Sequence, residues 1–350
     1  MFSVSNPDRP QAEEHFPAFA PLFDSHGRAI TDLRMAVTDH CNYRCVYCRT
    51  GNEGAQYSEL PMKDYFRIAQ VFVQLGIRKI RLTGGEPLLR KDIGALIRRL
   101  AELRTYPDGD PLDIAITTNG HLLEDQVHQL KADGLSRITV SMDAVNPETF
   151  ERITRVPGSF EKVQRGILAA KDAGLGSIKV NCVVLRGFNE DQIAPFAEFS
   201  RAHGVIVRFI EFMPLEEDRL WTPETVVPFS EVIARLEQVR PLVRLEPTAP
   251  GETAVRYTFD DGKGEIGIIA PVSRTFCGDC NRVRLTSDGK IRTCLFSHLD
   301  HDLYAVLKRG GSDEDLARFI EKTIAKKESR HHIGEPGFIK PLRSMVHIGG

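Results

Sequence analysis

Six of the seven cysteines fall into two spaced triads near opposite ends of the chain. The triads are Cys41, Cys45 and Cys48, and Cys277, Cys280 and Cys294. A [4Fe–4S] cubane has four irons that each need a further ligand, so three thiolates leave one iron open. An open iron can bind a small molecule. The two triads therefore predict two clusters that hold two small molecules close together for a reaction.

Zinc is the alternative metal for both triads. In the first triad the fourth zinc ligand would be His40, which is next to Cys41 and poorly placed to close a tetrahedron. The second triad is followed by His298 and, taken alone, fits a zinc site as well as a second cluster. The remaining cysteine, Cys182, lies in an apolar run and is predicted to be a core residue.

Two arginines follow the second triad directly. Arg282 and Arg284 lie on a predicted strand after Cys280, and the alternation of a strand places them on one face. Adjacent guanidinium groups repel each other unless an anion lies between them, and a polyphosphate suits their planar donors. The alternative is a pair of solvated arginines on a surface hairpin.

The composition excludes several classes of function. The chain of 350 residues is 41% hydrophobic and 27% charged, and its formal net charge is -2. Such a charge gives no overall field that attracts nucleic acid or a membrane. No run of about 18 apolar residues predicts a membrane span, and the first residues lack the features of a signal peptide. Cysteines spaced as metal ligands indicate a reducing compartment, and we expect a cytoplasmic protein.

Strand and helix patterns alternate six times between Asp32 and about Met213. The expected strands are residues 33–37, 79–82, 114–117, 137–140, 178–185 and 205–212. Polar or unusual residues follow nearly every strand, which favours a ring that gathers its loops on one face over a doubly wound sheet. We therefore expect an α/β fold with a partial, open (β/α)6 barrel over residues 26–227, preceded by a flexible arm of residues 1–25. Two hairpins and later helices predict an α+β module over residues 228–350.

Two motifs carry a resemblance to a known superfamily. Cys-x3-Cys-x2-Cys, with Tyr47 before its last cysteine, and the segment Thr83-Gly-Gly-Glu-Pro87 resemble the radical S-adenosylmethionine enzymes. The residues before the first triad, the spacing of the second, its Arg-Val-Arg segment and the final Gly-Gly are similar to GTP 3′,8-cyclases. These lyases open molybdenum cofactor biosynthesis.

The resemblance implies a reaction and its partners. A 5′-deoxyadenosyl radical would abstract hydrogen from C3′ of GTP, and C3′ would then bond to C8 to give 3′,8-cyclo-7,8-dihydroguanosine triphosphate. A flavodoxin-type or ferredoxin-type donor would supply electrons, and cyclic pyranopterin monophosphate synthase would take the product. We expect a homodimer with no nucleic-acid or membrane partner. The competing readings are a radical peptide maturase with an auxiliary cluster and a zinc-stabilised binding module.

The resemblance also assigns site residues. The triads would hold two [4Fe–4S] clusters, with guanine on the open iron of the second. S-adenosylmethionine would contact Tyr47, Gly84, Gly85, Glu86, Ser141 and Met213. GTP would contact Arg34, Arg81, Thr117, Lys179, Arg208, Arg282, Val283 and Arg284, with Val283 acting through its backbone. The catalytic residues would be Arg34, Arg282, Arg284, Gly349 and Gly350, with the last two reaching the site as the C-terminal tail.

Overall fold

A single curved sheet organises the computed structural model, which describes residues 19–49, 54–217 and 219–349. Its first six strands are parallel, and they neighbour one another in chain order. They are β1 (Asp32–Ala36), β2 (Lys79–Thr83), β3 (Asp113–Thr118), β4 (Arg137–Ser141), β5 (Lys179–Val184) and β6 (Ile206–Glu211). The six predicted strands and their parallel arrangement are confirmed.

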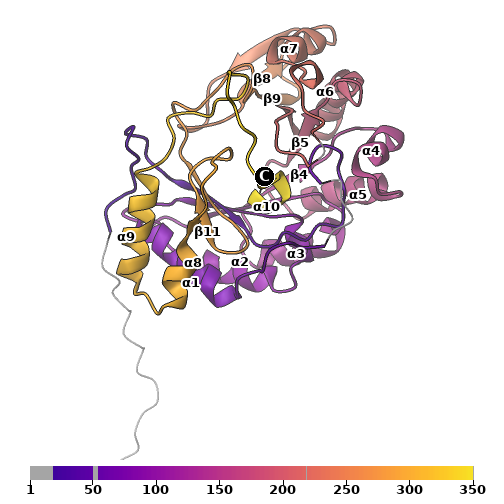
Figure 1. The fold of residues 1–350 in the computed structure, drawn as a ribbon. Helices are drawn as coiled ribbons and strands as arrows, with labels where there is room; N and C mark the ends of the chain where they lie inside the picture. Colours follow the sequence, from indigo (N-terminus) through magenta and orange to yellow (C-terminus); the bar gives the residue numbers. More distant parts are fainter. Residues whose placement is uncertain (1–18, 50–53, 218, 350) are drawn as a thin grey trace, which may run out of the picture.

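Helices connect these strands and surround the sheet (Figure 1). They are α1 (Met62–Gln74), α2 (Ile93–Ala101), α3 (Leu123–Ala132), α4 (Pro147–Thr154), α5 (Ser159–Asp172) and α6 (Ile193–His203). Short 3-10 turns occur at η1 (Pro87–Leu89), η2 (Glu190–Gln192) and η3 (Pro223–Thr225). The sequence pattern missed α4, a helix of eight residues, because two turns give too short an apolar repeat.

The C-terminal part adds strands to both edges of the six-stranded sheet. The strands are β7 (Leu242–Leu245), β8 (Val255–Phe259), β9 (Glu265–Ile269), β10 (Arg282–Leu285), β11 (Lys290–Arg292) and β12 (His301–Asp302). Both expected hairpins are present, as β8–β9 and β10–β11. In addition, β9 pairs with β6 and β10 pairs with β1, both in parallel. The module is thus continuous with the barrel sheet, in which eight neighbouring strands run parallel.

The helices of this part are α7 (Phe229–Glu237), α8 (Leu303–Lys308), α9 (Asp313–Ile324) and α10 (Met345–Ile348). Near the chain end, Val346 and Ile348 of α10 are buried. Figure 1 shows α10 in the middle of the ring of strands. The segment therefore belongs to the interior of the fold.

Alternation along the strands separates the core from the ring interior. In β5, Val180, Cys182 and Val184 are buried in the main hydrophobic core, so the core position predicted for Cys182 is confirmed. Lys179 and Asn181 alternate with these residues along the strand, so they face the other side of the sheet and line the cavity inside the ring. Each fully buried aliphatic side chain contributes about 1.5–3 kcal/mol, and this burial holds the intervening polar residues toward the interior.

The N-terminal arm joins the fold earlier than expected. Leu22 is buried, its N–H donates to the Leu75 carbonyl at 2.9 Å, and Phe23 forms a bridge with Ala29. Residues 1–18 of the predicted arm lie outside the described residues. In the described part of the chain, no helix is long and apolar enough to cross a membrane.

Candidate functional site

Both cysteine triads line one cavity of about 1600 Å3 inside the ring. The wall also contains most of the residues predicted to contact S-adenosylmethionine or GTP. These are Arg34, Tyr47, Arg81, Gly84, Gly85, Thr117, Ser141, Lys179, Arg208, Met213, Arg282 and Arg284. Residues from seven strands or their following loops thus converge on one space, as the position of polar residues at strand ends predicts.

The loop of the first triad follows β1 and packs against the end of α4. Arg44 and Val46, on either side of Cys45, donate backbone hydrogen bonds to Thr154 and Ile153 at 3.1 and 3.0 Å. Burial and the charge of Glu86 raise the pKa of the Cys41 thiol to about 11. A thiol with such a raised pKa stays protonated at neutral pH until metal binding displaces its proton, and three thiols on one loop fit the ligand set of a cluster.

Tyr47 is held at the cavity wall by an aspartate that was not predicted as a site residue. Its hydroxyl donates to Asp143 Oδ2 at 2.7 Å, and the Val183 N–H donates to Asp143 Oδ1 at 2.9 Å. Burial raises the pKa of Asp143 to about 6, although these two hydrogen bonds oppose the rise. The sequence signal was present, since Asp143 follows the end of β4.

The Gly-Gly-Glu-Pro segment packs on the loop that leads to the first triad. A Cβ atom on Gly84 would overlap the Thr38 carbonyl oxygen, and one on Gly85 would overlap that of His40. The Gly85 N–H donates to Thr38 and the Glu86 N–H to His40, at 2.9 and 2.7 Å. The two glycines are therefore required for close approach of two backbone segments of the protein.

Glu86 does not face the cavity, contrary to its predicted contact with the S-adenosylmethionine amine. Its carboxylate is fully buried and accepts hydrogen bonds from Leu88 N, Thr118 Oγ1 and Asn119 N at 3.0, 2.7 and 2.6 Å. Burial raises the pKa of Glu86 to about 7 against these donors. Glu86 instead fixes the ends of β2 and β3 relative to each other.

The second triad lies around the β10–β11 hairpin, with Cys277 and Cys280 before β10 and Cys294 after β11. Arg282 Nη2 donates to Cys280 Sγ at 3.2 Å, and Lys327 Nζ donates to the Arg282 carbonyl at 3.0 Å. Burial acts to raise the pKa of Cys280, but the charges of Arg282 and Lys327 outweigh it and lower the pKa to about 6. The side chain of Val283 points into the core, which leaves only its backbone for a ligand.

His298 does not complete a zinc site with the second triad. It is exposed and does not line the cavity. Among the described residues, no group of three or more His, Cys, Asp or Glu side chains is arranged to hold a single metal ion. A cubane spreads its thiolates over separate irons, whereas one zinc gathers sulfur ligands at about 2.3 Å. Three cysteines that line one cavity match the ligand number of a cubane with one open iron.

A row of cations crosses the cavity wall between the two triads. Arg34 pairs in register with Arg81 on one side and with Arg284 on the other. Burial lowers the pKa of Arg34 and of Arg81 to about 10; the charges of neighbouring arginines add to this effect, and the charge of Asp32 opposes it. The Arg34 Nε atom is buried without a hydrogen-bond partner. Like charges in neighbouring strands are destabilising, so this row is suited to an anion that is bound between the side chains.

Two further cations extend the row on β5 and β6. Burial and the charges of Arg208, Arg137 and Arg81 lower the pKa of Lys179 to about 7, and burial lowers that of Arg208 to about 10. Arg137 and Asn181 also line the cavity and were not predicted as site residues. Their inward position follows from strand register, which a sequence alone does not fix.

The C-terminal tail reaches the same wall. Arg284 Nη1 donates to the Gly349 carbonyl, and Met345 N–H donates to the Leu215 carbonyl at 3.0 Å. A Cβ atom on Gly349 would overlap Thr83 Oγ1 and lie 3.1 Å from Ala36 Cβ, so the tail sits at the ends of β1 and β2. Gly350 lies outside the described residues.

Comparisons with known proteins agree with this site. Residues 35–200 match the family model of the radical SAM superfamily, and residues 205–333 match Molybdenum Cofactor Synthesis C. A GTP 3′,8-cyclase of Xanthomonas axonopodis pv. citri is 43% identical over 340 residues, which are 95% of this chain and 99% of that protein. The chain belongs to the GTP 3′,8-cyclase family. A second member, from Syntrophomonas wolfei, is 39% identical over 94% of this chain and its whole length.

Solved structures support the fold independently. The crystal structure of Streptococcus suis SuiB bound to S-adenosylmethionine matches with a TM-score of 0.58 at 15% identity, over 84% of this chain and 68% of that chain. At this identity the likeness concerns the fold alone. Membership of the GTP 3′,8-cyclase family makes this chain a radical SAM enzyme of molybdenum cofactor biosynthesis, and the superfamily implies one [4Fe–4S] cluster and S-adenosylmethionine. The peptide-maturase and zinc-module readings of the sequence are therefore wrong.

Proposed function

We propose that the cavity binds GTP and S-adenosylmethionine together and converts GTP into 3′,8-cyclo-7,8-dihydroguanosine triphosphate. The observation that carries this proposal is that two separate cysteine triads and a row of cations share one cavity. A reaction between two bound molecules needs them held at close range in a fixed orientation.

The first triad would hold the cluster that binds S-adenosylmethionine. When bound, this pair supplies a 5′-deoxyadenosyl radical. The residues of the chain position the cofactor: Tyr47 is fixed by Asp143, and Ser141 and Met213 stand at the ends of β4 and β6. Gly84 and Gly85 present their backbone beside the triad because they lie against the loop that precedes it.

The second triad would hold a second [4Fe–4S] cluster, whose open iron would receive the guanine ring. Arg34, Arg81, Lys179 and Arg208 would bind the triphosphate, since each lines the cavity and lacks a carboxylate partner within salt-bridge distance among the described residues. Arg282 and Arg284 lie between the triad and this row. GTP would then be held at both ends, with its ribose facing the first triad.

The C-terminal Gly349 and Gly350 would complete the site. Arg284 is buried and donates to the Gly349 carbonyl, so the tail would orient this guanidinium toward the cavity. We further propose that cyclic pyranopterin monophosphate synthase receives the product. A homodimer and a cytoplasmic location remain predictions, and light scattering of the purified protein tests the first.

Anaerobic reconstitution followed by turnover of GTP deuterated at C3′ tests the function. The label should appear in 5′-deoxyadenosine. The second cluster is tested with Cys294→Ala, which should lower the iron and sulfide content by about half. Cys182→Ala is the matched control, because Cys182 is a buried core cysteine that should leave the metal content unchanged. Unlabelled 5′-deoxyadenosine, or full metal content in Cys294→Ala, would contradict the respective proposal.

A further inference from the structure

Four basic side chains are exposed on the outer surface beside the first triad, and we name them the arginine patch: Arg44, Arg152, Arg155 and Lys162. None of them lines the cavity. Arg44 is next to Cys45, and its N–H donates to the carbonyl of Thr154, the neighbour of Arg155. The patch therefore lies directly over the loop that would hold the first cluster.

The charges of the patch are not neutralised by nearby acids. Among the described residues, no carboxylate lies within salt-bridge distance of its four members. Glu151, on the same helix as Arg152, accepts instead from the Gly158 N–H at 2.7 Å. Glu124 pairs with Arg165 at 2.8 Å. The patch is thus a cluster of free positive charges, which is a surface that attracts an acidic partner.

A chain of contacts leads from the patch to the first triad. Lys162 Nζ lies 3.0 Å from His121 Nε2, and His121 Nδ1 lies 3.0 Å from the Tyr43 hydroxyl. The Tyr43 N–H in turn points to Cys41 Sγ at 3.4 Å. Tyr43 is buried, and its ring packs edge-on against His121. The surface at Lys162 is therefore connected to a cluster ligand by consecutive contacts through only two side chains.

We propose that an acidic one-electron carrier protein of the flavodoxin type docks on the arginine patch and reduces the first cluster from there. The inference rests on the proposed function, because a cluster at this triad would need one electron to generate the radical. In the step the carrier loses one electron and the oxidised cluster gains it, and no atom is transferred. The tertiary contact between the triad loop and α4 creates the docking surface.

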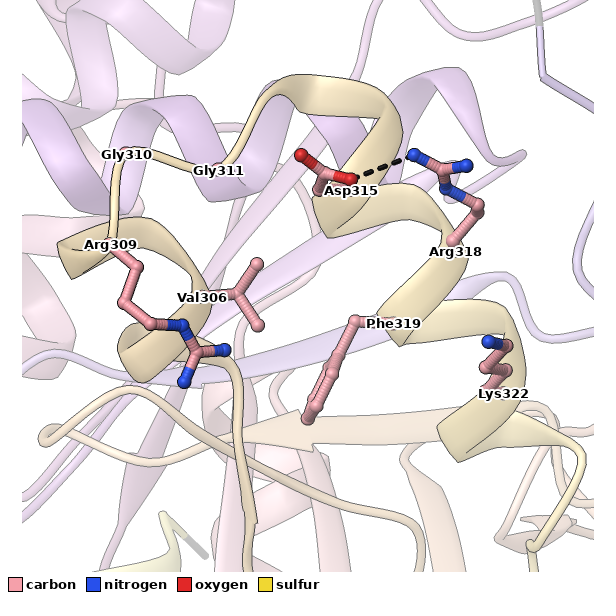
Figure 2. Close-up of a pocket in the computed structure, with 8 residues that line it drawn as sticks. All are labelled: Val306, Arg309, Gly310, Gly311, Asp315, Arg318, Phe319 and Lys322. Carbon is pink, nitrogen blue, oxygen red and sulfur yellow. Dashed lines mark hydrogen bonds and ion pairs between the residues drawn. The ribbon is translucent and has the colours of Figure 1, made fainter.

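A second group of basic residues offers a rival surface. A groove of about 630 Å3 lies at α8 and α9. Figure 2 shows its residues Arg309, Arg318 and Lys322 around Phe319. Here Arg318 pairs with Asp315 at 2.7 Å, and the first turn of α9 is acidic. In Figure 1 helices α8 and α9 lie on the opposite side of the ring from α4. The positive charges of this groove are partly neutralised, and the groove is on the other side of the ring from the arginine patch. Substitutions in the groove are therefore a suitable control.

The test compares two reductants of the same reconstituted enzyme. Arg44→Glu and Arg155→Glu, singly and together, should raise the KM for reduced flavodoxin by about tenfold or more in the double variant and weaken its dependence on salt. Turnover driven by dithionite should stay unchanged in both single variants. The control Arg309→Glu/Lys322→Glu changes the net charge equally and should leave the flavodoxin KM unchanged.

Each outcome decides between the possibilities. An unchanged KM in the double variant, or a raised KM in the α8–α9 control, would overturn the docking site. If Arg44→Glu fails to assemble its cluster, Arg155→Glu alone gives the answer, since its side chain does not belong to the triad loop. Absence of product with dithionite in the unaltered enzyme would overturn the proposed function and not the docking site, which flavodoxin binding measured by titration would still report.

Discussion

Arg343 anchors the C-terminal tail, and its loss should release Gly349 from the cavity. Its side chain is 5% exposed and donates to both oxygens of Asp288 at 3.0 and 2.9 Å and to Asp300 at 2.6 Å. Its guanidinium also lies 3.9 Å from the centre of the Tyr57 ring. These contacts join the tail to the turn between β10 and β11.

Breaking a buried ion pair from one side costs about 3–5 kcal/mol. Asp300 retains a second partner, Arg292, at 2.8 Å, so the lower value of about 3 kcal/mol applies to Arg343→Gln. At 1.4 kcal/mol per factor of ten, the ratio of docked to released tail falls about 100-fold. Turnover should fall by up to that factor, while the iron and sulfide content stays unchanged.

The assay measures product formation together with limited proteolysis of the C-terminus, which should become accessible in Arg343→Gln. Arg240→Gln is the control, since Arg240 forms an exposed pair with Asp260, and such pairs contribute little. A variant with full turnover and a protected C-terminus would refute the reasoning. Loss of iron or of the folded state would show that Arg343 supports the fold and not the tail.

The remaining predictions concern the tail, the triphosphate site and the aspartate behind Tyr47. Gly349→Ala should abolish turnover with both clusters intact, because a Cβ there meets Thr83; normal product yield would contradict this. GTP affinity should be highest below pH 7 and fall as the pH rises above it. The pKa of Lys179 is lowered to about 7, so its ammonium group is charged and attracts the triphosphate below that pH and loses its charge above it. Calorimetric titration of the enzyme and of Lys179→Met measures this, and an equal slope in both would refute it. Tyr47→Phe should lower the free energy of unfolding of the cluster-free protein by about 1–3 kcal/mol at pH 8. At this pH Asp143 is ionised, and the variant removes the hydrogen bond that its carboxylate accepts from the Tyr47 hydroxyl. Burial raises the pKa of Asp143 to about 6, so at pH 5 the carboxyl is mostly protonated and the loss of stability in Tyr47→Phe should be smaller. Thermal unfolding of both proteins at pH 8 and at pH 5 measures this difference.

The sequence determined the chemistry and the order of the elements. The spacing of the two triads and the residues after each strand predicted a cluster enzyme with a ring-shaped site, because cysteine spacing and strand alternation are local properties of the chain. The hairpins around Gly262 and Gly289 were likewise fixed by short-range turn preferences. These predictions needed no contact between distant residues.

Only the tertiary structure decided how distant segments meet. The pairing of β9 with β6 and of β10 with β1 places both triads around one cavity, and such long-range pairing leaves no periodic signal in the sequence. The same holds for Glu86, which has the expected position in its motif but is buried among three backbone and hydroxyl donors. A motif specifies which residues are adjacent along the chain, whereas packing decides which side of the backbone each of them faces.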